Sequence, residues 1–222
     1  MRNSIAGISF IGGGNMASAL IGGLVGAGLD PQRIHVAEPV EALRDLLAQR
    51  WGVQVHATAE AAAASSAVWV LAVKPQVLPD VCRGLAPLAA EAAPLVVSIA
   101  AGITCAQLDR WLGGDQAIVR TMPNTPALLG AGVTGLHANA RVDDARRAQA
   151  QQVLEAAGRT VWIEDEGHMD AVTGVSGSGP AYVFLLAEAM ETAALRQGLA
   201  PDAARLLVTQ TLLGAARMLD EA

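Results

Sequence analysis

Short apolar runs alternate with mixed, helix-like stretches along the first 120 residues of the chain. The run 68–73 (VWVLAV) is almost continuously apolar, which is typical of a strand covered on both faces. We predict strands at 5–11, 33–38, 53–55, 68–73, 95–99 and 117–121. Helices are predicted between them at 15–26, 40–49, 60–64, 75–89 and 104–111. This alternation predicts right-handed crossovers and a doubly wound, mainly parallel sheet.

The pattern changes after Met122. Two more strands are predicted at 133–137 and 160–163, around a helix at 143–156. From Gly167 onward the apolar spacing is helical, and helices are predicted at 169–175, 180–197 and 201–220. The sequence therefore predicts an α/β domain over residues 1–166, followed by an all-α domain over residues 167–222.

Composition and charge narrow the class of protein. Hydrophobic residues make up 52% of the chain and aromatic residues only 3%, so the core must consist largely of Ala, Val, Leu and Ile. This composition excludes a disordered chain. The net charge of −6 argues against nucleic acid and against an anionic membrane surface as partners. The longest uncharged stretch, 121–140, is broken by prolines and glycines, which argues against a membrane-spanning helix.

Cysteine and histidine usage gives no sign of a metal site. Cys82 and Cys105 lack the spacing of metal ligands or of a disulfide framework, so we expect two small core residues in a reduced, cytoplasmic compartment. Four histidines, at positions 35, 56, 137 and 168, are spread along the chain. Ordinary surface histidines are the favoured interpretation of all four.

The first stretch that could carry chemistry is ISFIGGGNMASAL, residues 8–20. Its Gly12-x-Gly14-x-x-Ala17 spacing matches the dinucleotide-binding fingerprint, and it lies between a predicted strand and a predicted helix. Gly12 permits the tight turn, Gly14 leaves room for a pyrophosphate, and Ala17 lets helix and strand pack closely. A tight turn without a ligand is the alternative.

Two charged residues follow predicted strands. Glu38 ends the second strand, where a carboxylate accepts hydrogen bonds from ribose hydroxyls and repels a 2′-phosphate. This position favours NADH over NADPH, unless Glu38 is only a solvated loop residue. Lys74 ends the buried strand 68–73, where ligands of such sheets bind. Pro75 suits the first position of the next helix. A plain surface charge is the alternative for Lys74.

Three further loops contain small and polar residues. SIAAG (98–102) and MPNTPALLG (122–130) both follow strands and offer room for a nicotinamide ring, although a turn-only role is equally compatible with the pattern. VTGVSGSGPAYVF (172–184) puts serines, glycines and Pro180 at the start of a long apolar helix. Pro180 is predicted at the first helical position, with Ser178 or Gly179 as the cap. Such a start can approach a small anionic ring closely.

Five segments together carry a family resemblance. FIGGGNMA, AVKPQ, VSIAAG, VRTMPNTPALLGAGVTGL and DAVTGVSGSGPAYVFLLAEAM closely resemble, in this order, the corresponding parts of pyrroline-5-carboxylate reductases. The resemblance implies an N-terminal Rossmann domain and a C-terminal helical domain that builds an intertwined homodimer, often assembled into decamers. It also implies hydride transfer from NADPH or NADH to the C=N carbon of 1-pyrroline-5-carboxylate, which gives L-proline.

The resemblance also implies site residues at matching positions. The implied cofactor-binding residues are Gly12, Gly13, Gly14, Asn15, Met16, Glu38, Ala72, Val73, Lys74, Pro75, Ala100, Ala101, Gly102 and Asn124. The implied substrate-binding residues are Glu166, Ser176, Gly177, Ser178, Gly179 and Pro180. Thr173 is the candidate catalytic hydroxyl, for a substrate imine that arrives neutral. Many members of the family carry Ser or Thr near the position of Glu38 to hold the 2′-phosphate, so this chain departs from the NADPH pattern.

The family continues past the last predicted helix into a Ser-Pro-Gly-Gly-Thr-Thr-like turn that holds the substrate carboxylate. The printed sequence ends at Ala222 before such a turn, and we expect it to be incomplete at its C-terminus. Two alternatives to the reductase remain open at this point. One is a dinucleotide-binding dimer without catalysis, and the other is a dehydrogenase of a related imine or hydroxy acid.

Overall fold

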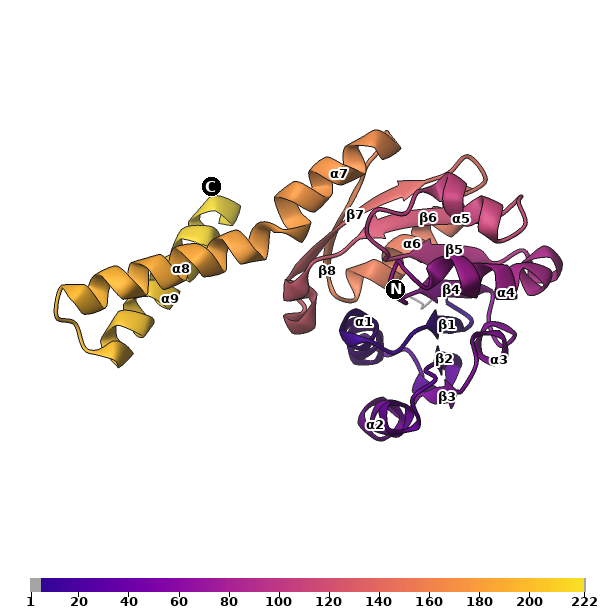
Figure 1. Ribbon diagram of the computed structural model, residues 1–222, viewed down its shortest axis with the longest axis horizontal. Coiled ribbons are helices and arrows are strands. Elements are labelled where there is room, and N and C mark those ends of the chain that lie inside the picture. Colours follow the sequence, from indigo (N-terminus) through magenta and orange to yellow (C-terminus); the bar gives the residue numbers. More distant parts are fainter. Residues whose placement is uncertain (1–4, 222) are drawn as a thin grey trace. The chain divides into compact units, whose positions relative to one another are not determined.

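The computed structural model of the chain describes residues 5–221. One eight-stranded sheet contains β1 (Ile8–Ile11), β2 (Ile34–Ala37), β3 (Gln54–His56), β4 (Val68–Leu71), β5 (Leu95–Ser98), β6 (Ala117–Met122), β7 (Gly132–Ala138) and β8 (Gly158–Trp162). Their spatial order is β3-β2-β1-β4-β5-β6-β7-β8 (Figure 1). Neighbouring strands are parallel except β6 and β7, which pair antiparallel with Arg120 opposite His137. The predicted doubly wound, mainly parallel sheet is confirmed.

Helices cover both faces of this sheet (Figure 1). They are α1 (Asn15–Gly26), α2 (Glu41–Trp51), α3 (Ala59–Ala63), α4 (Leu78–Ala92), α5 (Cys105–Trp111) and α6 (Asp144–Glu155). Short 3₁₀ turns lie at η1 (Pro31–Arg33), η2 (Thr125–Leu129) and η3 (Glu166–His168).

Successive side chains of β4 point to opposite faces of the sheet, so the core consists of two layers, one on each face. Val68 and Val70 pack in the cluster that includes Leu20 of α1 and Leu154 of α6. Trp69 and Leu71 pack on the opposite face, in the cluster formed with α3, α4 and α5. Every residue of this strand is buried, which explains the unbroken apolar run in the sequence.

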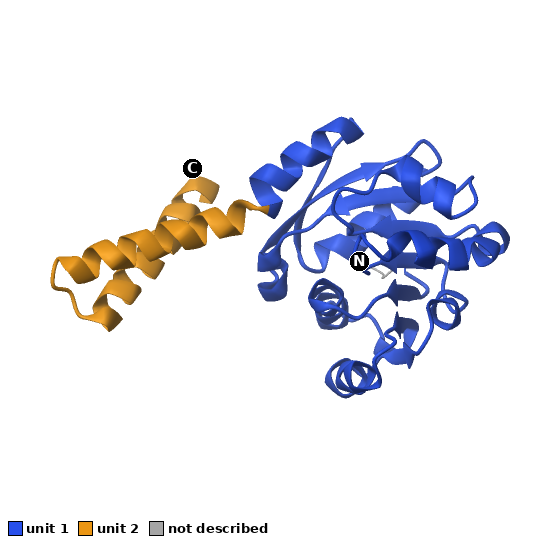
Figure 2. Ribbon diagram, in the orientation of Figure 1, with its two compact units in different colours: residues 1–177 blue, residues 178–222 orange. Residues whose placement is uncertain are grey.

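The chain divides into two compact units, residues 1–177 and residues 178–222 (Figure 2). Unit 1 contains the sheet, its helices, α7 (Met169–Val172) and a π-helical turn at η4 (Thr173–Gly177). Unit 2 contains two helices packed against each other, α8 (Gly179–Arg196) and α9 (Pro201–Glu221). Within residues 5–221, no helix combines the length and the apolar character that crossing a membrane requires.

Two predicted helix starts are wrong. Pro75 lies in a turn, and α4 begins three residues later at Leu78 with Pro79 in its first turn. Pro180 is the second residue of α8, after Gly179, and the side chain of Ser178 makes no capping hydrogen bond. The backbone of Ser178 is helical, with φ −86° and ψ −19°. A cap residue normally has extended dihedrals, so Ser178 cannot serve as a side-chain cap.

Candidate active site

A glycine loop connects β1 to α1. Gly12 has φ +108°, and a Cβ atom at this position would lie 2.8 Å from the carbonyl oxygen of Ala72. Only glycine fits there, because both the conformation and the space exclude a side chain. Gly14 is the N-cap of α1 and offers no side-chain acceptor, so the first backbone N–H groups of the helix are free to bind an anion.

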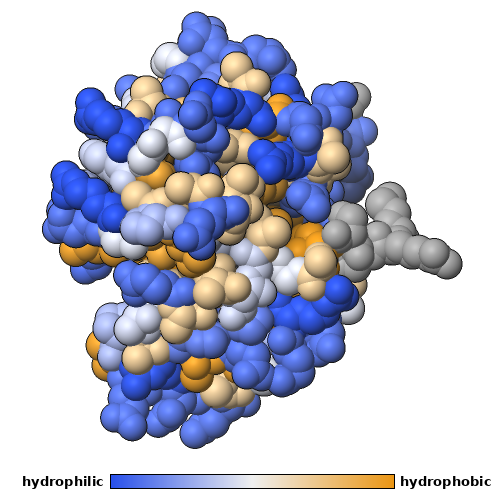
Figure 3. Space-filling model, turned by 90° about the vertical axis from the view of Figure 1, so that its right-hand side faces the viewer, coloured by the Kyte–Doolittle hydropathy of each residue, from blue (hydrophilic) through white to orange (hydrophobic). Residues whose placement is uncertain are grey.

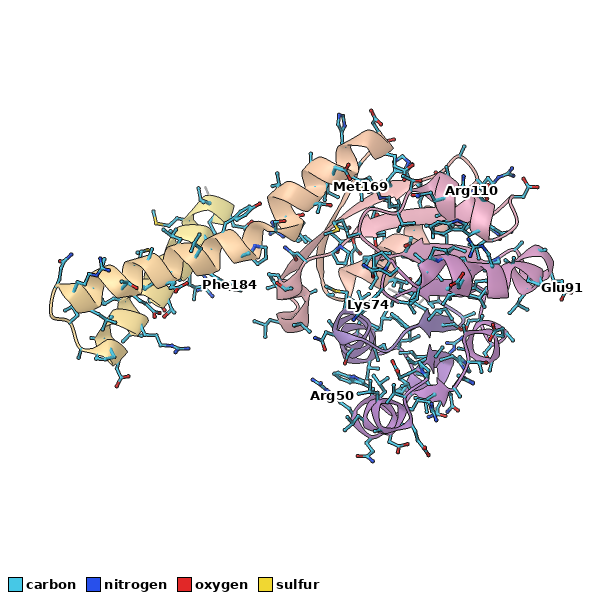
Figure 4. All side chains as sticks on the ribbon, in the orientation of Figure 1. Arg50, Lys74, Glu91, Arg110, Met169 and Phe184 are labelled. Carbon is cyan, nitrogen blue, oxygen red and sulfur yellow. The ribbon has the colours of Figure 1, made fainter. Side chains whose placement is uncertain are left out.

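This loop opens into a cleft of about 510 Å³. The cleft collects seven predicted cofactor-binding residues from three loops: Gly12, Gly13, Gly14, Glu38, Ala72, Val73 and Lys74. Lys74, labelled in Figure 4, follows β4 and lines the cleft. The predicted residues Asn15, Met16, Pro75, Ala100, Ala101, Gly102 and Asn124 are not among those that line it.

Glu38 is 9% exposed and lies at the end of β2. Its Oε1 accepts a hydrogen bond from the backbone N–H of Val40 at 3.1 Å, and its Oε2 accepts one from Gly13 at 3.4 Å. The carboxylate is thereby fixed beside the glycine loop, where an adenosine ribose would bind in a Rossmann domain. A dinucleotide therefore fits this cleft, with the glycine loop for its pyrophosphate and Glu38 for its ribose.

The loops after β5 and β6 carry the remaining predicted cofactor residues. Ala100, Ala101 and Gly102 follow β5, and Gly102 has φ +74°. Asn124 follows β6 and is 8% exposed. Its Nδ2 donates to the carbonyl oxygen of Ser176 at 3.1 Å, and its Oδ1 accepts from the N–H of Val133 at 3.0 Å. The Asn124 side chain therefore ties this loop to the π-helical turn.

The π-helical turn holds three of the predicted substrate-site residues. The hydroxyl of Thr173 donates to the carbonyl oxygen of Met169 at 3.0 Å, and that of Ser176 donates to Val172 at 2.9 Å. Gly177 leaves room for Met122, whose Cε would lie 2.5 Å from an added Cβ. Ser178, Gly179 and Pro180 belong to unit 2, at the start of α8. π-helical turns are rare and occur frequently at functional sites.

Glu166 takes part in a charged network that the sequence did not predict. Its Oε1 accepts from the backbone N–H of Cys105, the first residue of α5, at 2.8 Å, and from Nη1 of Arg120 at 3.3 Å. Arg120 has a side chain only 7% exposed, and its Nη2 contacts Oδ1 of Asp170 at 3.4 Å. The only sequence signal for this network is one arginine inside the apolar strand AIVRTM.

Burial in this region also affects the thiol of Cys105. Burial first, and the Glu166 carboxylate second, raise the pKa of the thiol to about 12. Cys82, on α4, has its pKa raised to about 12 by burial. Both thiols are therefore protonated at neutral pH, in keeping with the prediction of two small core residues. Figure 3 shows a face of the molecule on which hydrophilic residues surround a central area of apolar ones.

The Rossmann sheet, the glycine loop and the cleft define a dinucleotide-dependent oxidoreductase. Two family models match the chain. Residues 166–222 match the family described as “Pyrroline-5-carboxylate reductase dimerisation”. Residues 7–102 match the family described as “NADP oxidoreductase coenzyme F420-dependent”.

Similar proteins of known name narrow the class of oxidoreductase to one family. It is 49% identical to a pyrroline-5-carboxylate reductase of Pseudomonas aeruginosa over 211 residues, which are 95% of this chain and 77% of the relative. A pyrroline-5-carboxylate reductase of Vibrio alginolyticus is 44% identical over 211 residues, with the same shares covered. The chain belongs to the pyrroline-5-carboxylate reductase family.

Solved structures agree with this assignment. A pyrroline-5-carboxylate reductase of Coxiella burnetii has a TM-score of 0.94 and 41% identity, over 99% of this chain and 81% of that one. A pyrroline carboxylate reductase of Plasmodium falciparum, solved with NADP bound, has a TM-score of 0.88 and 28% identity, over 100% of this chain and 81% of that one. The predicted family, fold class and oxidoreductase class are confirmed.

Proposed function

We propose that this protein reduces 1-pyrroline-5-carboxylate to L-proline with NADPH or NADH, the last step of proline biosynthesis. The observation that carries the proposal is the cleft that unites the glycine loop with Glu38, in a chain of this family. The bound nicotinamide supplies the hydride, and the C=N carbon of the substrate is already electrophilic, so the chain mainly has to bind and orient both molecules.

The residues of the cleft have distinct roles in this proposal. Backbone N–H groups at the start of α1 hold the pyrophosphate, Gly12 permits the tight turn against Ala72, and Gly14 leaves open space beside the helix start. Glu38 accepts hydrogen bonds from the adenosine ribose. The loops at Ala100–Gly102 and Asn124 border the nicotinamide, and Asn15, Met16 and Pro75 complete the cofactor site.

The substrate site is proposed at Glu166 and at Ser176, Gly177, Ser178, Gly179 and Pro180. Thr173 is the proposed proton donor to a neutral imine. Its hydroxyl hydrogen is engaged with Met169, so the side chain has to rotate before it can donate to the substrate. We further propose that the functional division of the chain lies at residue 166, since the dimerisation model begins there.

Substrate-dependent oxidation of NADPH and NADH by the full chain tests the activity. Turnover with either cofactor supports the proposal. NADPH binding by calorimetry without turnover would favour the non-catalytic dinucleotide-binding dimer. Turnover only with other imines or hydroxy acids would favour a related dehydrogenase.

Thr173→Val tests the proton donor, since valine keeps the shape and removes the hydroxyl. We expect kcat to fall about tenfold or more, with the KM for the cofactor unchanged. Thr209→Val is the matched control, because the Thr209 hydroxyl also donates to a carbonyl four residues earlier, on α9. An unchanged kcat for Thr173→Val would remove Thr173 from the reaction.

A homodimer is the proposed assembly, with further association into decamers. Its support is the dimerisation model and the apolar surface of unit 2, where Tyr182, Phe184, Leu185, Leu206, Met218 and Leu219 are each more than half exposed. Exposed large apolar side chains in such numbers support a protein–protein interface. We also propose a cytoplasmic location, which the two free cysteines support.

A further inference from the structure

Three donor side chains of different chemistry meet in unit 1, outside the cleft. They are the thiol of Cys105 at the start of α5, the imidazole of His137 on β7 and the carboxylate of Glu166 in η3. One ligand atom from each lies within 4.8 Å of the other two. The antiparallel pairing of β6 and β7 brings His137 opposite Arg120, which in turn contacts Glu166.

The geometry around the three donors prepares them for a cation. Nδ1 of His137 lies 2.9 Å from the carbonyl oxygen of Ile163. A carbonyl only accepts, so Nδ1 carries the hydrogen and Nε2 keeps a free lone pair. Metal-binding histidines are usually oriented in this way. Oε1 of Glu166 accepts two hydrogen bonds, from the backbone N–H of Cys105 and from Arg120, which fix the carboxylate beside the thiol.

The charges of the network also suit a divalent cation. Arg120 lies between two carboxylates, those of Glu166 and Asp170. Two carboxylates and one guanidinium leave one net negative charge, and a thiolate at Cys105 adds a second. A doubly charged cation balances this set, while Arg120 stays in contact with both carboxylates.

We propose that Cys105, His137 and Glu166 form a binding site for Zn²⁺, with water as the fourth ligand. Sulfur, imidazole nitrogen and carboxylate oxygen are its usual ligands, at about 2.0–2.3 Å, which places ligand atoms about 3.5 Å apart. The ligand atoms of the three side chains lie within 4.8 Å of one another, so small side-chain movements bring them to this geometry. On binding, the Cys105 sulfur forms a bond to Zn²⁺, and its proton leaves to solvent.

Isothermal titration of the chelator-treated full chain with ZnCl₂ tests the site directly and does not depend on the reductase assay. We expect one Zn²⁺ per chain for the unmodified protein. Binding should weaken by about 10-fold or more in Cys105→Ser and in His137→Ala, since each removes one ligand.

Two matched controls separate this site from other thiols and imidazoles. Cys82→Ser removes the other buried cysteine, and His56→Ala removes a partner of the partly buried pair in which Nδ1 of His35 lies 3.0 Å from Nε2 of His56. Both variants should bind Zn²⁺ as the unmodified chain does. Loss of binding in His56→Ala with retention in Cys105→Ser overturns the proposal, as does absence of Zn²⁺ binding.

If Cys105→Ser does not fold, Co²⁺ binding to the unmodified chain still tests whether Cys105 is a ligand. A thiolate ligand gives Co²⁺ a sulfur-to-metal charge-transfer band in the near ultraviolet. We expect this band in the unmodified chain and in Cys82→Ser. A Co²⁺ complex without the band excludes Cys105 as a ligand.

Discussion

Glu38 is fixed at the end of β2 by two backbone N–H groups, with 9% of its surface exposed. A carboxylate held in this position binds the two hydroxyls of an unmodified ribose and repels a phosphate at the 2′ position. We therefore propose that the preference between the two cofactors depends largely on this one side chain.

Glu38→Ser is expected to raise the ratio of kcat/KM for NADPH to that for NADH by about tenfold or more, which is about 1.4 kcal/mol or more of relative transition-state binding. Steady-state kinetics with both cofactors measures the ratio. Glu41→Ser is the control, because Glu41 is an exposed residue at the start of α2 and does not line the cleft. The same ratio in all three proteins would show that Glu38 does not select the cofactor.

Arg120 is a second residue whose replacement is expected to lower the stability of the fold. Arg120→Met leaves Glu166 and Asp170 without their common partner, and we expect the free energy of unfolding to fall by about 1–3 kcal/mol. Urea denaturation at a fixed protein concentration measures it. Arg83→Met breaks a pair whose side chains are 60% and 87% exposed, and should change stability by less than about 0.5 kcal/mol. Equal losses in both variants would contradict a buried ion-pair role for Arg120.

Among the elements, α1 determines how the dinucleotide loop is held. A Cβ atom on Gly23 would lie 1.9 Å from the carbonyl oxygen of Ala156, at the C-terminal end of α6. Gly23 therefore allows α1 to pack directly against the backbone of Ala156, which cannot move away easily. The position of the free N–H groups at the start of α1 depends on that approach.

Gly23→Ala is expected to destabilise the fold by about 1–3 kcal/mol and to weaken NADPH binding, because α1 must shift away from Ala156. Thermal unfolding and calorimetric titration with NADPH measure the two effects. Gly26→Ala, at the end of the same helix, has no atom within 4 Å of the added Cβ and should be neutral or slightly stabilising. If both variants behaved alike, close packing of α1 would not explain the effect.

Elements with a regular pattern could be predicted from sequence, and the contacts between them could not. The unbroken apolar run of β4 and the Gly12–Ala17 spacing each predict one structure from local chemistry. The π-helical turn at Thr173–Gly177 has no comparable pattern, since its serine and two glycines resemble a helix cap. The helix start predicted at Pro75 is three residues too early for the same reason, because a proline suits both a turn and a helix start.

The functional site could also be predicted from the sequence only in part. The residues that line the cleft lie in loops that directly follow strands, so the sheet topology brings them together. Arg120 and His137 lie 17 residues apart and meet through the register of β6 and β7. Cys105, at the start of α5, joins them only in the folded chain. No spacing rule along the chain could have found them.

At the scale of the whole molecule, unit 2 carries an apolar surface that its own two helices do not bury. Phe184 projects from α8 and is 67% exposed (Figure 4). Such a residue suits the centre of an interface with a second copy, where aromatic side chains contribute strongly to binding.

Phe184→Lys is expected to shift the protein from dimer to monomer, with at least about a tenfold rise in the dissociation constant. Analytical ultracentrifugation over a range of concentrations measures it. Leu46→Lys is the control, since Leu46 is 60% exposed on α2 of unit 1. Dimer retained to the same dilution in both variants would remove α8 from the interface.

The strand order has a consequence for synthesis on the ribosome. The last strand of the sheet ends at Trp162, and the helices of unit 2 begin at Gly179. At about 5–20 residues per second, translation of the stretch from 163 to 222 takes roughly 3–12 s. Every strand is thus available for pairing before the apolar surface of α8 and α9 emerges. The nascent chain can therefore complete its sheet before the exposed apolar side chains of unit 2 have emerged.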